Sequence, residues 1–152
     1  MMPPAISNLT DHTGYWMRMV SNAVSQEFAR KVAEEGVTVA EWSFMRVLFD
    51  EEPSPPSVLA DRMGMTRGAI SKLTDRLAAK GLILRNESDT GRRGQLLSLT
   101  PAGRAKVPVL ARLADANEAE YFSVLNGKER DTLNRILRVL VERGGLSATP
   151  VD

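Results

Sequence analysis

Residues 56–81 read PSVLADRMGMTRGAISKLTDRLAAKG and predict two short helices joined by a tight turn. A helix-turn-helix needs a small residue where the helices touch, a residue that tolerates positive φ in the turn, and an apolar anchor on the second helix. Ala60, Gly64 and Ile70 supply these three features, at separations of four and six residues. Ala60 lies one helical turn before the bend, and Ile70 follows one free turn of the second helix. We therefore expect a helix-turn-helix unit here.

The second helix of this unit has one apolar and one polar face. Thr66 is its predicted N-cap, and Ile70, Leu73 and Leu77 recur at steps of three and four residues. The opposite face is small, polar and basic, and comprises Gly68, Ser71, Lys72 and Asp75, with Arg67 on its flank. Such a face fits a DNA major groove about 12 Å wide, and the helix N-terminus attracts phosphate.

We predict that this helix contacts DNA through Thr66, Arg67, Gly68, Ser71 and Lys72. Arg67 and Lys72 are candidate donors to guanine or to phosphate, and the two hydroxyls can donate to either. The alternative is an amphipathic surface helix whose polar face meets only water.

Two runs of strand length follow, LILRNE at 82–87 and QLLSLT at 95–100. The polar turn between them contains Arg92 and Arg93, so the pattern predicts a β-hairpin with a basic tip. Arginines on such a ribbon can reach a narrow, strongly negative minor groove. We predict DNA contacts for Arg92 and Arg93 too, although paired loop arginines considered alone are more often solvated charges.

Charge is distributed unevenly along the chain. The net charge is only +1, but residues 57–106 contain ten basic and four acidic side chains, which gives this segment +6. The rest of the chain contains ten basic and fifteen acidic side chains, which gives −5. A basic middle with acidic flanks is typical of a nucleic-acid-binding lobe on an acidic scaffold. The alternative is a solvated surface of uneven charge.

Helices are also predicted before the helix-turn-helix. Apolar residues recur at steps of three and four over 11–35, and Thr38 with Glu41 forms a capping box for a helix through about Asp50. A loop at 51–56 follows, because its three prolines remove amide donors and disfavour helical dihedral angles.

Two more helices are predicted after the hairpin. Thr100 is an N-cap followed by proline at the first helical position, so a helix should run from there to about Leu125. Pro108 lies too deep for the first turn, and we expect a kink or a short break there. A last helix begins after Asn126 and stops near residue 144, and we expect the tail 146–152 to be mobile.

The composition excludes several classes of protein. At 152 residues, with 43% hydrophobic and 26% charged residues, the chain is expected to fold as one domain, 1–152. It has no cysteine and a single histidine, His12, which argues against disulfides, thiolate metal sites and Ser-His-Asp relays. No phosphate-binding glycine loop or nucleophile elbow is present, so we expect neither an enzyme nor a cofactor. No apolar run approaches the roughly 18 residues of a membrane span, so we expect a cytoplasmic protein without a membrane partner.

Residues 37–103 resemble the multiple-antibiotic-resistance regulator (MarR) family of winged helix-turn-helix transcription factors. The resemblance is carried by TVAEW at 38–42, LADRMGMTRGAISKLTDRLAAKGLI at 59–83 and RRGQLLSLTPAG at 92–103. It implies a mainly α fold with a small β-hairpin wing, in which a winged helix-turn-helix lobe at 38–100 is joined to dimerisation helices at 11–35 and 101–143.

The resemblance also implies a homodimer on double-stranded DNA, with each recognition helix in a major groove and each wing tip in a minor groove. By position the recognition helix is Thr66 to Lys80, and Arg93 matches the family's wing arginine. Gly91 stands where the family usually has an aspartate that orders the wing, and Asp89 is the residue that could replace it.

The family further implies an effector pocket between the dimerisation helices and the DNA-binding lobe, often for phenolic or aromatic acids. Candidate lining residues are His12, Trp16, Met17, Trp42 and Met45. The alternative is that the four apolar side chains are ordinary core and His12 lies on the surface.

Together these features predict a sequence-specific transcriptional regulator, favoured as a repressor, that binds a pseudo-palindromic operator as a homodimer and is released by a small aromatic ligand. Its half-sites should lie about one helical turn of DNA apart. The alternative is a winged-helix protein-interaction module that never touches DNA.

Overall fold

The computed structural model describes residues 1–87 and 94–151 of the chain. Within them the elements follow one another in this order: η1 (Leu9–Asp11), α1 (Thr13–Glu34), α2 (Val39–Glu51), α3 (Pro56–Met63), α4 (Arg67–Ala79), β1 (Ile83–Glu87), β2 (Gln95–Leu99), α5 (Pro101–Phe122) and α6 (Gly127–Gly144). The predicted fold, mainly helical with a two-stranded antiparallel hairpin, is confirmed.

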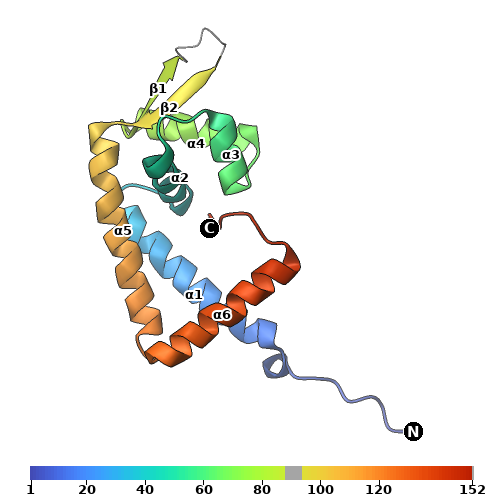
Figure 1. Ribbon diagram of the computed structural model, residues 1–152. Helices are drawn as coiled ribbons and strands as arrows, with labels where there is room; N and C mark the ends of the chain where they lie inside the picture. The colour runs from blue at the N-terminus through green and yellow to red at the C-terminus, as the bar shows by residue number, and fades with distance from the viewer. Residues whose placement is uncertain (88–93, 152) are drawn as a thin grey trace.

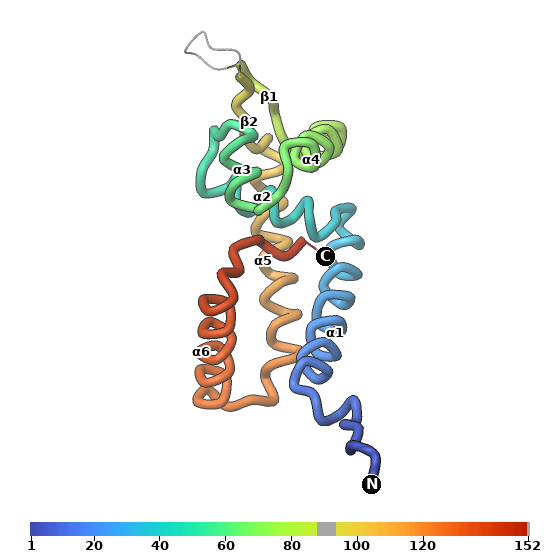
Figure 2. The backbone as a smooth tube through the Cα atoms, turned by 90° about the vertical axis from the view of Figure 1, so that its right-hand side faces the viewer, coloured from blue at the N-terminus to red at the C-terminus, as the bar shows by residue number. Residues whose placement is uncertain are grey.

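The elements form a small lobe that sits on a set of long helices (Figure 1). The lobe contains α2, α3, α4 and the hairpin, and α5 runs from the base of the hairpin down to the turn before α6. The turned view shows the lobe at one end, with α1, α5 and α6 below it (Figure 2). Among the described residues, none of the helices combines the length and apolar character that a membrane crossing needs.

Local capping explains where four of the helices begin. The side chains of Thr38, Thr66, Thr100 and Asn126 each accept a hydrogen bond from the backbone N–H three residues later. These bonds satisfy N–H groups that have no partner inside the helix. The predicted capping box of Thr38 and Glu41 is present, with Glu41 N donating to Thr38 Oγ1 at 3.1 Å and Thr38 N donating to Glu41 Oε1 at 2.8 Å.

One hydrophobic core holds the lobe together and joins it to α5. Its fully buried side chains come from α2, α3, α4, β2 and α5, and include Phe44, Leu48, Leu59, Ile70, Leu77, Leu97 and Leu110. Because every element of the lobe contributes to this core, the outward face of α4 is held in a fixed position relative to the hairpin.

The hairpin is extended by the loop before α3. β1 pairs with β2 in antiparallel register, with Ile83 opposite Leu99 and Glu87 opposite Gln95. Ser54 then pairs with Leu97 through two backbone bonds, Ser54 N to Leu97 O at 3.0 Å and Leu97 N to Ser54 O at 2.8 Å. Ser54 lies between Pro53 and Pro55, so it is the residue of that trio with an N–H to donate.

Of the kink or short break expected at Pro108, the break is wrong, because α5 continues without interruption from Pro101 to Phe122. Proline at this position removes the hydrogen bond to the carbonyl of Arg104. Both residues lie on the exposed side of the helix, so water can replace that bond.

The tail 146–151, whose mobility stays a prediction, lies beside the lobe in the structure. After α6 the chain turns back toward the lobe (Figure 1), where Thr149 Oγ1 donates to Arg62 O at 3.3 Å and Val151 packs against the core. The sequence pattern does not reveal this, because an anchor of three or four residues has no periodicity.

Candidate nucleic-acid interface

The turn between α3 and α4 has the geometry that a helix-turn-helix needs. Gly64 ends α3 with φ +64° and ψ +33°, in the left-handed region, and Met65 N donates to Ala60 O at 3.0 Å. Ala60 is buried at the helix contact, and Ile70 is fully buried as the anchor of α4. The three predicted roles are confirmed.

This turn presents α4 with its polar face toward solvent. Ile70, Leu73, Thr74 and Leu77 are buried on the inner side, where Thr74 Oγ1 donates to Ile70 O at 2.8 Å. The five predicted contact residues of the helix are all exposed, and the structure brings them together around its N-terminal half: Thr66, Arg67, Gly68, Ser71 and Lys72. Thr66 also caps the helix, with Ala69 N donating to its Oγ1 at 3.1 Å.

Gly68 leaves the first turn of α4 uncovered. A Cβ added there would meet nothing closer than Thr66 Oγ1 at 4.0 Å, so no contact within the chain requires glycine. The missing side chain instead leaves the N-terminal amides of α4 open to an approaching anion.

The positive charges of this face are not neutralised by the rest of the described chain. Within residues 1–87 and 94–151, neither Arg67 nor Lys72 takes part in an ion pair. The one carboxylate on the outward face, Asp75, is paired with Arg85 of β1. That pair offsets the negative charge of Asp75 and ties the recognition helix to the base of the hairpin.

Sequence reasoning missed the Asp75–Arg85 pair. The two residues lie ten positions apart on different elements, and no local signal shows which way Arg85 points. Arg92 and Arg93, predicted at the tip of the hairpin, lie outside the described residues, as do Asp89 and Gly91.

An ion pair between a buried carboxylate and a partly exposed lysine fixes the far end of α4. Glu41 of α2 is fully buried, and Lys80 Nζ donates to Glu41 Oε1 at 2.9 Å and to Gly36 O at 2.8 Å. Burial by itself raises the pKa of Glu41, but hydrogen bonds from Lys80 and Thr38, together with the charge of Lys80, outweigh it and lower this pKa below 4.5. The end of the recognition helix is therefore tied to the start of α2.

The five residues predicted to line an effector pocket are not brought together within one chain. His12, Trp16 and Met17 are exposed at the start of α1, whereas Trp42 and Met45 lie on α2 beyond the other end of that helix. Trp16 and Glu34 are separated by 18 residues of helix, roughly 27 Å at about 1.5 Å per residue. Met45 is fully buried in the core, as in the alternative interpretation.

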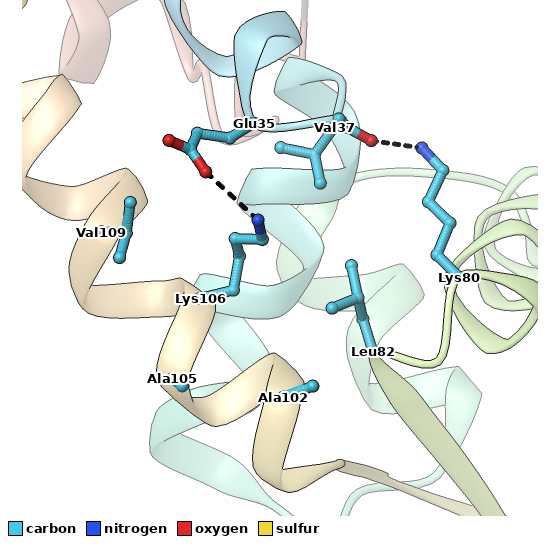
Figure 3. Close-up of a pocket in the computed structure, with 9 residues that line it drawn as sticks. Glu35, Val37, Lys80, Leu82, Ala102, Ala105, Lys106 and Val109 are labelled. Carbon is cyan, nitrogen blue, oxygen red and sulfur yellow. Dashed lines mark hydrogen bonds and ion pairs between the residues drawn. The ribbon is translucent and has the colours of Figure 1, made fainter.

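The structure instead has a groove between the α1–α2 loop, the α4–β1 turn and α5 (Figure 3). Its volume is about 620 Å³. Val37, Leu82, Ala102, Ala105 and Val109 form an apolar lining, with Glu35, Gly36, Lys80 and Lys106 beside them. Lys106 Nζ lies 3.2 Å from Glu35 Oε2. None of the five predicted residues lines this groove.

The described part of the chain contains no cluster of three His, Asp or Glu side chains that could hold a metal ion. Its assembled features are a small, cationic helix face, an open helix N-terminus and an adjacent hairpin. Such a surface can enter a DNA groove and donate to phosphates and base edges.

Comparison with known proteins agrees with this geometry. A sequence model described as the MarR family matches residues 35–94. A Thauera aromatica protein named as a transcriptional regulatory protein for the hcr operon is 32% identical over 149 residues, which cover 95% of this chain and 87% of that protein.

Two solved structures share the fold. The S. aureus MepR–DNA complex has a TM-score of 0.78 and 21% identity over 87% of this chain and 98% of MepR. CouR from Rhodococcus jostii RHA1, bound to p-coumaroyl-CoA, has a TM-score of 0.75 and 20% identity over 95% of this chain and all of CouR. The relatives are named as transcriptional regulators. The chain therefore belongs to the MarR family of winged-helix, DNA-binding transcriptional regulators.

Proposed function

We propose that the protein is a repressor that binds a pseudo-palindromic operator as a homodimer and is released by a small aromatic ligand. The observation that carries the DNA-reading role is the outward face of α4. Arg67 and Lys72 there are exposed and, within the described residues, outside every ion pair. Thr66, Gly68 and Ser71 supply hydroxyl groups and an uncovered backbone beside them.

Dimerisation is supported by apolar surface that the chain leaves exposed. On α6, Ile136, Leu137, Leu140 and Val141 are 36–49% exposed, although they recur at helical steps on one side. On α1, Trp16, Met17, Met19 and Val20 are 46–52% exposed. Exposed rows of large apolar side chains on long helices are normally buried against a partner, and a second copy of the chain supplies the same rows by symmetry.

Repression is the regulatory effect that we propose for such a dimer. Two recognition helices held at a fixed separation favour a two-fold symmetric site, and a dimer covering that site blocks other proteins from the DNA.

Release by a ligand is supported by the groove beside the α4–β1 turn. Its apolar lining suits an aromatic ring. Lys106 is paired with Glu35 and Lys80 with Glu41, so a ligand carboxylate would replace Glu35 as the partner of Lys106. In the relative CouR the bound molecule carries an aromatic acyl group. Of the predicted lining residues, His12, Trp16 and Met17 of one chain can share a second site with Trp42 of its partner if α1 of one chain approaches α2 of the other, whereas Met45 is buried in the core.

The DNA-reading role is tested with alanine variants of Arg67 and Lys72. If a side chain reads a base, its replacement by alanine should weaken the binding free energy by about 1–3 kcal/mol and relax specificity at one base pair of the operator. If a side chain contacts phosphate, its replacement should weaken binding evenly on all sequences and reduce the slope of log affinity against log salt concentration by about one. Lys128→Ala is the matched control and should leave both quantities unchanged, because Lys128 is in the first turn of α6 and that helix begins at the end of the molecule away from the lobe (Figure 1). If neither Arg67→Ala nor Lys72→Ala changes DNA binding, the assignment of α4 is wrong.

The ligand is tested by titrating benzoate and 4-hydroxybenzoate while following tryptophan fluorescence and operator release. Trp16 and Trp42 are the two tryptophans of the chain, so Trp42→Phe separates their signals. Loss of response in Lys106→Met would support the groove. Loss of response in Trp16→Phe, with the groove variant unchanged, would support the site built from two chains, and no response to either acid would argue against aromatic acids as effectors.

A further inference from the structure

The C-terminal tail joins the end of α6 to the helix-turn-helix. α6 ends at Gly144, and Gly145 follows with φ +62°, which directs the chain back toward the lobe (Figure 2). Leu146 N donates to Val141 O at 3.0 Å and so fixes the start of the tail. The exit direction is therefore set by a helix C-cap and not by the tail alone.

Three contacts then hold the tail against the lobe. Thr149 Oγ1 donates to Arg62 O at 3.3 Å, and this carbonyl lies in the last turn of α3, where carbonyls have no partner inside the helix. Ala148 lies directly on Gly64: a Cβ at Gly64 would be 2.8 Å from Ala148 Cβ. Val151 is half-buried against the core of the lobe.

α6 has few other links to its own chain. Among the described residues, the loop after α5 and the ion pair of Arg130 with Glu118, at 2.8 Å, connect its N-terminal end. Its apolar residues from Ile136 to Val141 remain exposed. The C-terminal half of α6 is therefore tied to the lobe by the tail.

We propose that residues 147–151 act as a strap whose positioning residues, Ala148, Thr149 and Val151, couple the orientation of the helix-turn-helix to α6. This inference rests on the proposed function, in which α6 lies in the dimer interface. The strap then transmits the position of the partner subunit to the turn at Gly64 and so to the recognition helix. The dimer should therefore be selective for the spacing between the two half-sites of the operator.

The strap is tested by comparing DNA duplexes that differ only in half-site spacing. The variants are a chain ending at Leu146 and the double variant Thr149→Val with Val151→Asp. Ser147→Asp adds a charge to the same segment without touching an anchor and is the matched control. Thr149→Ser keeps the hydroxyl and should behave as the unaltered protein.

We expect the strap variants to lose about tenfold in affinity at the best spacing and much less at spacings one or two base pairs away, because only simultaneous binding of both half-sites depends on geometry. Affinity for a duplex with a single half-site should change less than twofold. An unchanged shape of the spacing profile, whether all affinities rise, fall or stay, would overturn the proposal.

A second measurement does not depend on DNA. Gly64→Ala should lower the ratio of folded to unfolded protein at least about threefold more in the full chain than in the chain ending at Leu146, because only the full chain has Ala148 against that position. Equal effects in both backgrounds would overturn the strap. Failure of the proposed function gives a different result: the unaltered protein would be a monomer in light scattering, or it would bind none of the duplexes.

Discussion

At Gly103 α5 lies directly against the backbone of the lobe, and replacement of this glycine by alanine is expected to be strongly destabilising. A Cβ at this position would lie 2.0 Å from Leu82 O and 3.0 Å from Leu82 C. Both are backbone atoms, so no side-chain rotation can relieve the overlap. The chain on one side must move by about 1 Å, and forcing extra atoms into a packed contact typically costs about 1–3 kcal/mol.

The movement also weakens two hydrogen bonds at the same place. Thr100 N donates to Leu82 O at 3.1 Å, and Thr100 Oγ1 donates to Gly81 O at 2.6 Å. Each contributes about 0.5–1.5 kcal/mol. The helix propensity of alanine returns up to about 1 kcal/mol, so the expected net loss is about 1–5 kcal/mol of unfolding free energy.

The assay is urea unfolding followed by circular dichroism, with Gly14→Ala as the control. Gly14 lies in the first turn of α1, and a Cβ there would meet nothing within 4 Å, so this variant should be neutral or slightly stabilised. If the unfolding free energy of Gly103→Ala lies within about 0.5 kcal/mol of that of the unaltered protein, α5 does not pack on the lobe as described.

Three further outcomes are expected. Gly64→Val should lose about 1–2 kcal/mol from the left-handed backbone alone, and a neutral result in urea unfolding would contradict the turn. The pKa of Glu41 is lowered in the folded protein, so its contribution to stability is present above pH 4.5 and lost as the pH falls through the lower folded value. The difference in unfolding free energy between the unaltered protein and Glu41→Gln, measured from pH 3 to 7, should therefore become smaller below pH 4.5. A difference that does not change with pH would contradict the ion pair of Glu41 with Lys80. Asp75→Asn should change stability by less than about 1 kcal/mol, because the Asp75–Arg85 pair is largely exposed. The Asp75→Asn variant should also bind DNA of random sequence more tightly, with a steeper dependence of affinity on salt, because the surface of α4 that faces DNA becomes more positive. Weaker binding would show that pairing with Arg85 matters more for placing the hairpin than the charge of Asp75 does.

The parts of the fold that were predicted correctly are those with local signals. Thr38, Thr66, Thr100 and Asn126 each cap the helix that follows, and a cap acts within three residues. The helix-turn-helix could be predicted because Gly64 and Ile70 have roles defined by their own positions along the chain. The exposed face of α4 follows from the same periodicity that buries Ile70 and Leu77.

The features that were missed depend on contacts between distant segments. Ser54 pairs with Leu97 across 43 positions, and Thr149 meets Arg62 across 87. No spacing rule connects such residues, because the path of the chain between them decides whether they meet. Gly103 is a related case: in the sequence it is a poor helix former near a helix start, and only the packed structure shows that Leu82 leaves no room for a side chain.

The most direct test of the central claim is a selection from random duplex DNA with the purified protein at about 100 mM salt, followed by anisotropy titration of the enriched sequence between roughly 50 and 200 mM salt. We predict enrichment of a two-fold pseudo-palindrome, bound by two chains with an affinity that falls steeply as salt rises. Absence of any enriched sequence, together with weak binding to every duplex at all salt concentrations, would contradict a homodimer that reads an operator through α4.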